Sequence, residues 1–423
     1  MSGSRLPRSA NRVVNDAVRR AFVDGTALSR AELADRTGLS RSALQNAVAR
    51  MLDNGELVTA DGDGPRGSGR PAHLFRLGTT TPTTSVVELH PDGSTTVTTA
   101  ARGDEGHPRH DALPWHSDFA RWTTALADVL GSLHADPGSE SYPQPPVVVS
   151  IPFPFAPGRG VPIHPPVAPP ARRPGSRLPV PDWLSSDPTP ELDALLGRPV
   201  QVVNDVDLAA LAEVHRGAAR GALTAIHVSV RDGVGGAVVV DGRVTTGAGG
   251  MTGELAHVQV VPDGPLCGCG NRGCIATQTR SPSLVTALAL RYGHDVSFDD
   301  METLVAHDDA LAVRFLTDLG RLVGGPLATV VGFLDPDVLV VDGRLGAAVG
   351  PVSRGITEVL HQRCSPAVVA ATRVVAGRFT RPGPVGAGIV GEALAAGRVA
   401  DVLRVTATPP PPGRVEEASE NVG

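Results

Sequence analysis

The sequence contains no lysine, so all 38 of its basic residues are arginine. Aromatic residues make up only 3% of the chain, and its cores must therefore be built from alanine, valine and leucine. No apolar run approaches the about 20 residues of a membrane-spanning helix, and no segment resembles a signal peptide. We therefore expect a soluble, cytoplasmic protein that does not contact a membrane.

Cysteine is also scarce, but three of the four cysteines fall within eight residues. The fourth, Cys364, stands alone, which argues against a disulfide framework. One imidazole and three thiolates supply the four ligands of a tetrahedral structural Zn²⁺ site, and the glycines between them let the backbone turn sharply. The sequence thus predicts zinc bound by His257, Cys267, Cys269 and Cys274; the alternative is a chance group of buried thiols.

Charge is distributed unevenly along the chain. Residues 1–76 hold 12 arginines against 8 acidic residues, whereas the remainder holds 26 against 36. A basic head on an acidic body suggests that only the head meets a polyanion.

The head, residues 1–76, has the pattern of three consecutive helices. Apolar residues at i, i+3, i+4 and i+7 from Val14 mark the first. Ser29 and Glu32 stand in the S-x-x-E order of a capping box, which opens a second helix. Gly38 then supplies a tight turn before the third.

The third helix begins after Ser40 and is expected to enter the major groove of DNA. Leu57–Thr59 and Leu74–Leu77 predict two short strands around a Gly-rich loop, so the head is predicted to be a winged helix-turn-helix. The polar face of the third helix and the wing loop supply the candidate DNA-binding residues Arg41, Ser42, Gln45, Asn46, Arg50, Arg66 and Arg70. The alternative is a small three-helix domain with a solvated polar face.

The body reads as alternating strands and helices, which predicts an α/β fold with two lobes and a cleft between them. Residues 143–190 contain 16 prolines and are expected to run as an extended excursion until regular structure resumes at Val200. Helices are expected over 119–133 and 385–403. The tail from Thr406 is predicted to be disordered.

The residues around the cysteine cluster and at Asn204-Asp205 resemble the ROK family, which is named for repressors, open reading frames and sugar kinases. Gly253–His257 with the three clustered cysteines is similar to the family signature G-E-x-G-H…C-x-C-G-x-x-G-C, with Ala256 in place of one glycine. Asn204-Asp205 resembles the family's N-D-x-N-x-x-A-x-x-E segment, with Asp207 in place of the second Asn.

The resemblance implies an N-terminal winged helix-turn-helix followed by a two-lobed actin-like (sugar-kinase-type) ROK domain. It implies that Asp205 is the position of a catalytic base and that Asn204, Glu254 and His257 hold a sugar. For Asn204-Asp205, the residues alone also allow a simple helix cap after a strand.

Several kinase positions depart from the family pattern. The first phosphate loop, D-x-G-x-T in the family, is expected near 77–81, where no carboxylate occurs. Asp342-Gly343-Arg344 replaces a G-G pair expected to face adenosine, and its two bulky charged side chains are expected to crowd that pocket. Ala276 stands where a second sugar-binding Glu is expected, and loss of such a partner costs about 1–3 kcal/mol. The later Gly-rich loop, from Asp232 to Gly236, partly retains the family's pattern for a loop that holds ATP.

These observations, with the family resemblance, predict a non-catalytic DNA-binding transcriptional regulator of the repressor type, with a vestigial base at Asp205. Its expected partners are a palindromic double-stranded operator and a sugar or sugar phosphate in the cleft, and it is expected to be a homodimer or homotetramer. The alternative is an ATP-dependent sugar kinase that retains a DNA-binding head. The expected parts are the head at 1–76, a small lobe at 77–202 to which 383–405 returns, a large lobe at 203–382 and the tail at 406–423.

Overall fold

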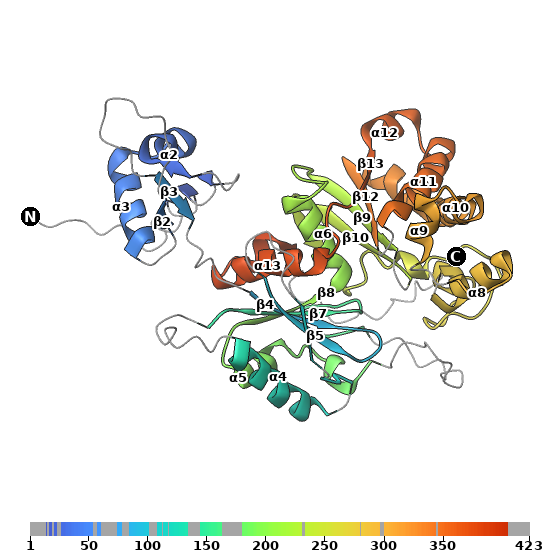
Figure 1. The fold of residues 1–423 in the computed structure, drawn as a ribbon, viewed down its shortest axis with the longest axis horizontal. Coiled ribbons are helices and arrows are strands. Elements are labelled where there is room, and N and C mark those ends of the chain that lie inside the picture. The colour runs from blue at the N-terminus through green and yellow to red at the C-terminus, as the bar shows by residue number, and fades with distance from the viewer. Residues whose placement is uncertain are drawn as a thin grey trace, which may run out of the picture. The chain divides into compact units, whose positions relative to one another are not determined.

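The computed structural model divides the chain into two compact units, Met1–Pro82 and Thr83–Gly423 (Figure 1). The structure describes residues 14, 17–18, 21–22, 27–53, 57–60, 74–77, 84–100, 108–111, 113–116, 118–133, 144–162, 180–230, 233–279, 281–296, 300–343 and 346–404. Among these residues, no helix combines the length and the apolar character needed to cross a bilayer.

The first unit contains the helices and strands that the sequence predicts for the head. Residues 14, 17, 18 and 21 are helical, and an antiparallel sheet of order β1-β3-β2 follows. The remaining elements are β1 (Leu28–Ser29), α2 (Arg30–Thr37), α3 (Arg41–Asp53), β2 (Leu57–Ala60) and β3 (Leu74–Leu77). The β2–β3 connection, with Arg66 and Arg70, lies outside the described residues.

Local sequence determines the turn between α2 and α3. The Ser29 side chain accepts a hydrogen bond from the Glu32 N–H while the Glu32 carboxylate accepts from the Ser29 N–H, so the predicted capping box is present. Gly38 ends α2 in the left-handed region at φ 63°, where a side chain is disfavoured. The structure thus contains the two consecutive helices and the Gly38 turn that the sequence predicts between them.

One apolar face of α3 forms the core of this unit. Leu44, Val48 and Met51 are buried at helical spacing, and they pack with Leu33 of α2 and Phe75 of β3. Burial of this face leaves the opposite face of α3 to solvent.

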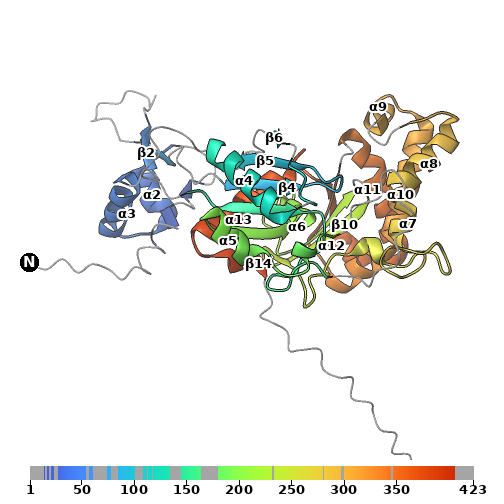
Figure 2. The same ribbon diagram turned by 90° about the horizontal axis from the view of Figure 1, so that it is seen from below.

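The second unit is built from two sheets and their helices (Figure 2). The small sheet has the order β6-β5-β4-β7-β8, in which β4 is parallel to β7 and β7 to β8. Its strands are β4 (Thr84–Leu89), β5 (Thr95–Ala100), β6 (Pro108–Asp111), β7 (Val147–Ile151) and β8 (Val200–Asn204). Helices α4 (Phe119–Leu133) and α5 (Thr189–Leu196) pack on one face through Trp122, Leu126 and Leu192.

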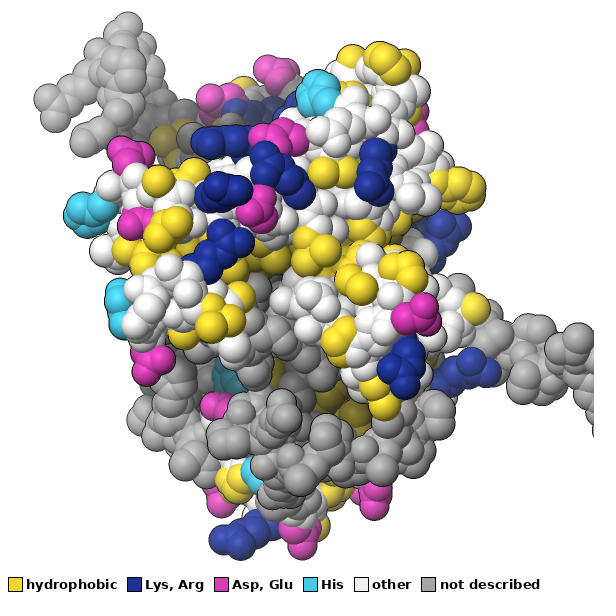
Figure 3. Space-filling view, turned by 90° about the vertical axis from the view of Figure 1, so that its right-hand side faces the viewer, with side chains coloured by type: hydrophobic (Ala, Val, Ile, Leu, Met, Phe, Trp, Pro, Cys, Tyr) yellow, Lys and Arg dark blue, Asp and Glu magenta, His cyan; other side chains and the backbone are white. Residues whose placement is uncertain are grey.

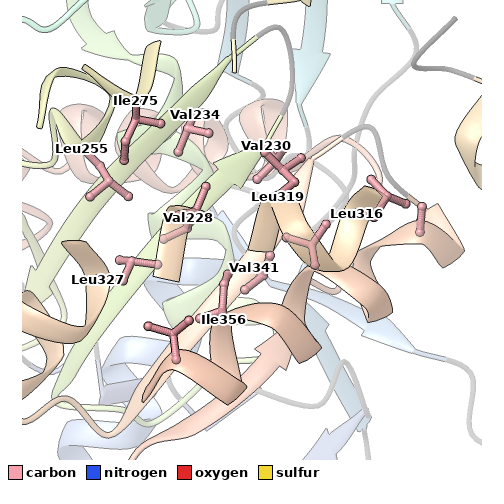
Figure 4. Close-up of a cluster of buried hydrophobic side chains, with 14 of the residues drawn as sticks. Val228, Val230, Val234, Leu255, Ile275, Leu316, Leu319, Leu327, Val341 and Ile356 are labelled. Carbon is pink, nitrogen blue, oxygen red and sulfur yellow. The ribbon is translucent and has the colours of Figure 1, made fainter. Parts of the chain in front are cut away.

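The large sheet has the order β13-β12-β9-β10-β11-β14. Its strands are β9 (Thr224–Val230), β10 (Val234–Val240), β11 (Arg243–Thr245), β12 (Val338–Gly343), β13 (Arg373–Ala376) and β14 (Leu403–Arg404). One face packs against α10 (Ala310–Leu334) and α11 (Val349–Arg363) (Figure 4). Val228 and Val341 from the sheet meet Leu316, Leu327 and Ile356 from the helices there.

Shorter elements complete the large-sheet side of the unit. They are η2 (Leu255–His257), α7 (Ile275–Thr279), α8 (Ser281–Tyr292), α9 (Met301–Ala306), η4 (Gly346–Ala348) and α12 (Pro366–Ala371). The helices predicted between Pro282 and Leu334 are thus confirmed. On the face shown in Figure 3, the described arginine and acidic side chains are interspersed, as expected for a solvated surface.

Two helices lie between the sheets. Helix α6 (Asp205–Arg216) and α13 (Pro382–Ala395) share one buried cluster with residues of both sheets, including Val148 of the small sheet and Val340 of the large sheet. The layers therefore run from α10 and α11 through the large sheet, α6 and α13, and the small sheet to α4 and α5. The prediction of an α/β fold is confirmed.

Two expectations about the body need correction. The final helix ends at Ala395 rather than near 403. The last part of the segment 383–405 forms β14, which pairs with β11 of the large sheet, so this part does not return to the small lobe. The proline-rich stretch also contains regular structure, because η1 (Asp182–Leu184) and α5 precede Val200. Sequence reasoning missed α5 because proline is compatible with a first helical turn, where Pro190 lies. Residues 163–179 and the tail from 405 lie outside the described residues.

Candidate functional site

The predicted metal ligands come together in the structure. The ligand atoms of His257, Cys267, Cys269 and Cys274 all lie within 4.8 Å of one another. Nδ1 of His257 is 3.5 Å from Sγ of Cys267, and Sγ of Cys269 is 3.7 Å from Sγ of Cys274. This group could hold a metal ion, as the spacing predicts.

Backbone contacts build the loop that carries these thiols. The N–H groups of Val260 and Val261 both donate to the Gly273 carbonyl, and the Cys267 N–H donates to the Asn271 carbonyl at 2.7 Å. Gly273 has φ 62°, and a Cβ there would overlap the Val261 carbonyl oxygen. Only glycine fits this close approach, so the G-C step of the signature has a packing cause.

The donor set is suited to a soft divalent cation. Burial, together with the neighbouring Cys269 and Cys267, raises the pKa of the Cys274 thiol to about 12. Three thiolates this close would repel one another, and a cation among them removes that repulsion and favours the deprotonated form. Sulfur and imidazole nitrogen in a group of four are the ligands of structural zinc sites.

Glu254 contacts the other side of the same imidazole. Its Oε2 lies 3.7 Å from Nε2 of His257, and both side chains are about three-quarters buried. A carboxylate at this position orients a metal-bound histidine and fixes which ring nitrogen carries the proton. The metal group and the predicted sugar-binding Glu are therefore neighbours through His257.

Asn204 caps α6, which is the simpler of its two sequence interpretations. Its side-chain oxygen accepts hydrogen bonds from the N–H groups of Val206 and Asp207, and its amide nitrogen donates to the Phe153 carbonyl at 2.7 Å. These contacts already occupy most of the hydrogen-bonding capacity of the amide. Asp205, at the first position of α6, is half-buried.

A third carboxyl group lies near Asp205 and Glu254. Asp207 is only 8% exposed. Its burial, with the charges of Asp205 and Glu254 as smaller causes, raises the pKa of Asp207 from 3.8 to about 8. The substitution of Asp for the family's second Asn therefore places an acid with a high proton affinity beside the predicted ligand residues.

Ala276 is buried against the predicted cysteine ligands and does not lie on an open surface. It is 4% exposed and packs in one cluster with Cys267 and Cys274. A methyl group at this position offers no hydrogen bond to a sugar hydroxyl.

The first hairpin of the second unit is not built to hold a phosphate. The predicted phosphate loop at 77–81 lies outside the described residues except for Leu77. In the β4–β5 turn, the N–H groups of His90 and Gly93 are bonded within the turn, the Ser94 N–H donates to the Asp92 carboxylate, and Pro91 has no N–H. Phosphate loops need free backbone N–H groups, and the N–H groups of His90, Gly93 and Ser94 are already bonded.

Two other kinase-like positions differ from their sequence interpretation. Gly235 and Gly236 lie within strand β10, not in a loop. A Cβ on Gly236 would lie 2.7 Å from the Gly253 carbonyl oxygen. The absence of a side chain at Gly236 therefore allows β10 to lie close to Gly253, where the segment that leads to His257 begins.

Asp342 is buried rather than projecting into a pocket. Its Oδ2 lies 3.2 Å from Nε2 of His227, and both side chains are nearly inaccessible. The expectation that the Asp342 side chain crowds an adenosine pocket is therefore wrong, because this side chain points towards His227 of β9. Arg344 lies outside the described residues. Sequence reasoning missed His227, which has no motif around it.

The predicted DNA-binding face of α3 is exposed. Arg41, Ser42, Gln45 and Asn46 all lie on the solvent side of the helix, and no acidic residue occurs in its first turn. Arg50 is in the same helix, but its side chain is outside the described part of the structure, as are Arg66 and Arg70.

Two sets of carboxylate contacts that join distant parts of the chain were not foreseen. Arg381 donates to Glu88 of β4 at 2.9 Å, across 293 residues of sequence. Glu213 of α6, only 1% exposed, accepts hydrogen bonds from the N–H groups of Ala218, Arg378 and Phe379. Separations this long carry no periodic signal, although Glu213 is the Glu of the N-D-x-N-x-x-A-x-x-E segment.

Two sheets that share a pair of central helices define an α/β protein of the actin-like, sugar-kinase type. The ROK family pattern matches residues 176–389, and the chain belongs to the ROK family. The predicted family and fold are thereby confirmed.

The curated relatives include both kinases and a repressor. The chain is 35% identical over 164 residues to an N-acetylmannosamine kinase of Citrobacter koseri, covering 38% of this chain and 55% of the kinase. It is 29% identical over 213 residues to the DNA-binding transcriptional repressor Mlc of Escherichia coli, covering 48% of this chain and 52% of the repressor. The chain thus spans about half the length of the curated relatives it matches.

Solved structures also match the chain, and one of them covers nearly all of it. It is a ROK family transcriptional regulator, described as a homologue of the Escherichia coli Mlc protein, with a TM-score of 0.71 and 22% identity. The match covers 93% of this chain and 98% of the regulator. At this identity the likeness concerns the fold alone.

Proposed function

We propose that this protein is a DNA-binding transcriptional regulator, a repressor in which a winged helix-turn-helix reads an operator. The observation that carries the proposal is the face of α3, on which Arg41, Gln45 and Asn46 are exposed with no acid in the first turn. Arginine, glutamine and asparagine are the side chains that pair with guanine and adenine edges in the major groove.

The extent of the regulator likeness supports the same proposal. The fold match covers 93% of the chain, a share that Thr83–Gly423 alone does not reach, so it extends into the unit that carries α3. Arg50, Arg66 and Arg70 are proposed to contact the DNA backbone beside this helix.

The body is proposed to sense a ligand rather than to transfer phosphate. In the β4–β5 turn the N–H groups of His90, Gly93 and Ser94 are already bonded, and Ala276 offers no acceptor. Phosphoryl transfer depends on holding the phosphates in position and neutralising their charge, and N–H groups that are already bonded do not provide this. Asp205 and Glu254, with Asn204 and His257 beside them, are proposed to bind a sugar or sugar phosphate.

The metal is proposed to be structural zinc bound by His257, Cys267, Cys269 and Cys274. All four ligands of a tetrahedral ion then come from the protein, so no coordination position is open for a catalytic water. A homodimer or homotetramer is proposed, so that two heads contact a palindromic operator with half-sites about one or two helical turns apart.

Selection from a random duplex library tests the DNA-binding proposal, because it identifies a preferred sequence even when the operator is not known. The full-length protein is expected to enrich a palindromic sequence. The variant Gln45→Ala is expected to lose that preference, whereas Glu358→Ala, which changes an exposed ion pair of α11, is expected to retain it. Recovery of no enriched sequence at low ionic strength would contradict the proposal.

A sugar kinase with a DNA-binding head is the second candidate. Retention of Asp205 and Glu254 and the N-acetylmannosamine kinase relative favour it. Incubation with magnesium-ATP and a panel of hexoses tests it directly. Turnover that disappears in Asp205→Ala would establish the kinase, and absence of turnover across the panel supports the regulator.

A further inference from the structure

We infer that the ligand of the body carries a positive charge: the carboxyl groups of Asp205, Asp207 and Glu254 bind a sugar with a protonated amine rather than a sugar phosphate. The inference rests on the proposed function, because it names the chemical class of the ligand that the body is proposed to sense. Two features of the structure carry it, the place where the three acidic residues meet and the burial of Asp207.

The acidic first turn of α6 packs against the start of β10. A Cβ on Gly235 would lie 2.7 Å from Cγ2 of Val206, which is the residue between Asp205 and Asp207. Asn204 holds this turn in place, because its side-chain oxygen accepts hydrogen bonds from the N–H groups of Val206 and Asp207. Both acidic residues therefore start from a fixed position beside Gly235.

Glu254 lies against the same part of β10. A Cβ on Gly236, the next residue of the strand, would lie 2.7 Å from the Gly253 carbonyl oxygen. Val234, the first residue of β10, shares a buried cluster with Leu255, the residue after Glu254 (Figure 4). The start of β10 thus brings Glu254 and the first turn of α6 to one part of the molecule.

Asp207 is buried there with no partner for its carboxyl group. The side chain belongs to a residue that is only 8% exposed, and no described residue donates a hydrogen bond to it or pairs with it. The charges that act on it, those of Asp205 and Glu254, are negative and add to the effect of burial, which raises its pKa to about 8. A buried polar group without a partner is unfavourable, so a ligand that supplies hydrogen-bond donors here is stabilised.

The neighbouring metal group does not offset this negative charge. Glu254 contacts that group through His257, at 3.7 Å from its Nε2 atom. Three thiolates outnumber the two charges of a zinc ion, so the filled group is itself negative. A sugar phosphate is therefore repelled from this part of the molecule, whereas a cationic ligand is attracted to it.

A bare metal ion does not fit the three carboxyl groups. Within the described part of the chain, the set of His257 and the three clustered cysteines is the one group of such side chains close enough to hold an ion. A sugar is larger and reaches carboxyl groups that are further apart. Its ammonium group offers three donors and one positive charge, and its hydroxyls offer further donors, so an amino sugar supplies what these acids lack.

Calorimetric titration of the full-length protein tests the inference with glucosamine, galactosamine and mannosamine as probes. Each is compared with its parent hexose, its N-acetylated form and its parent hexose 6-phosphate at about pH 6.5, below the usual pKa of an amine. At least one amino sugar is expected to bind about tenfold more tightly than its parent hexose, because hydrogen bonds between charged groups are stronger than neutral ones. Acetylation removes the charge and is expected to remove this gain, and the 6-phosphate is expected to bind more weakly than the hexose.

Asp207→Asn keeps the size of the side chain and removes its charge. The variant is expected to lose most of the preference for the amino sugar, leaving its affinity within about threefold of that for the parent hexose. Asp318→Asn, which changes an exposed carboxyl group of α10, is the matched control and is expected to keep the full preference. Thermal unfolding checks that both variants fold.

Equal affinities for every amino sugar and its parent hexose would overturn the inference while leaving a DNA-binding regulator with a neutral sugar ligand intact. Tighter binding of a 6-phosphate would overturn it as well. If Asp207→Asn does not fold, the comparison of ligands on the unsubstituted protein still decides the question. Conversely, binding of an amino sugar by a protein that selects no duplex would overturn the proposed function and support the assignment of the ligand.

Discussion

The carboxylate of Glu254 lies 3.7 Å from Nε2 of His257. The other nitrogen of the same ring faces Cys267 at 3.5 Å. One imidazole therefore separates the proposed ligand residues from the proposed metal. A metal bound through Nδ1 would hold the ring beside Glu254, so the metal site is expected to hold the ligand site in shape.

Cys269→Ser is expected to lose zinc and to lower the free energy of unfolding, because metal binding is coupled to folding. Elemental analysis and a thermal melt measure both effects. Cys364→Ser is the matched control, since Cys364 lies outside the metal group and donates to the Ala328 carbonyl. Native protein that contains no zinc would contradict the assignment.

Glu254→Ala is expected to weaken zinc binding by about 10–100-fold, the usual effect of removing a carboxylate that orients a metal-bound histidine. Competition with a chromogenic chelator gives the affinity. Glu358→Ala, which removes an exposed carboxylate of α11, is expected to leave it unchanged. Equal affinities in the two variants would show that Glu254 does not orient His257.

Asp207→Asn is expected to change the pH dependence of stability. Because the pKa of Asp207 is raised from 3.8 to about 8, the folded protein retains a proton that the unfolded chain releases in that window. The free energy of unfolding therefore falls as pH rises from about 4 to about 8. An amide stays neutral throughout, so the substitution removes this loss.

Chemical unfolding at about pH 5.5 and about pH 8.5 measures the effect of Asp207→Asn. Relative to the unsubstituted protein, the variant is expected to gain at least about 1.4 kcal/mol more at the higher pH, the free energy of one pKa unit. Asp318→Asn, at an exposed site, is the control. The same difference at both pH values would show that Asp207 titrates normally.

Substitutions in the DNA-binding unit are expected to fall into two groups. Arg41→Ala and Gln45→Ala are expected to relax sequence preference, costing about 1–3 kcal/mol at the cognate base pair. Arg66→Ala is expected to weaken binding to all duplexes alike and to reduce the salt slope by about one. Equal losses on every sequence for all three variants would contradict the assignment of base readers.

Short-range patterns made much of the fold predictable. The Ser29–Glu32 capping box, the Gly38 turn and the apolar spacing of α3 are determined by neighbours in sequence, and all three are confirmed. The clustering of His257 with the three cysteines was also predictable, because His257 and Cys274 lie on one short segment whose glycines have a packing role.

Long-range contacts were not predictable in the same way. The Glu88–Arg381 pair and the His227–Asp342 pair join residues that only the folded sheets bring together. Helix α5 was missed because proline was taken as a breaker, although it fits a first turn. The end of α13 was extended too far because Leu403 continues the apolar pattern but belongs to a strand of the large sheet.

The most direct test of the account is the affinity of full-length protein for its selected duplex between about 50 mM and about 200 mM salt. Contacts from arginine to phosphate release counterions, so binding is expected to be sequence-selective and to weaken by orders of magnitude over this range. The same preparation is expected to show no sugar phosphorylation with magnesium-ATP. Salt-independent binding, or turnover with no affinity for DNA, would contradict the central claim that the exposed face of α3 makes this protein a regulator.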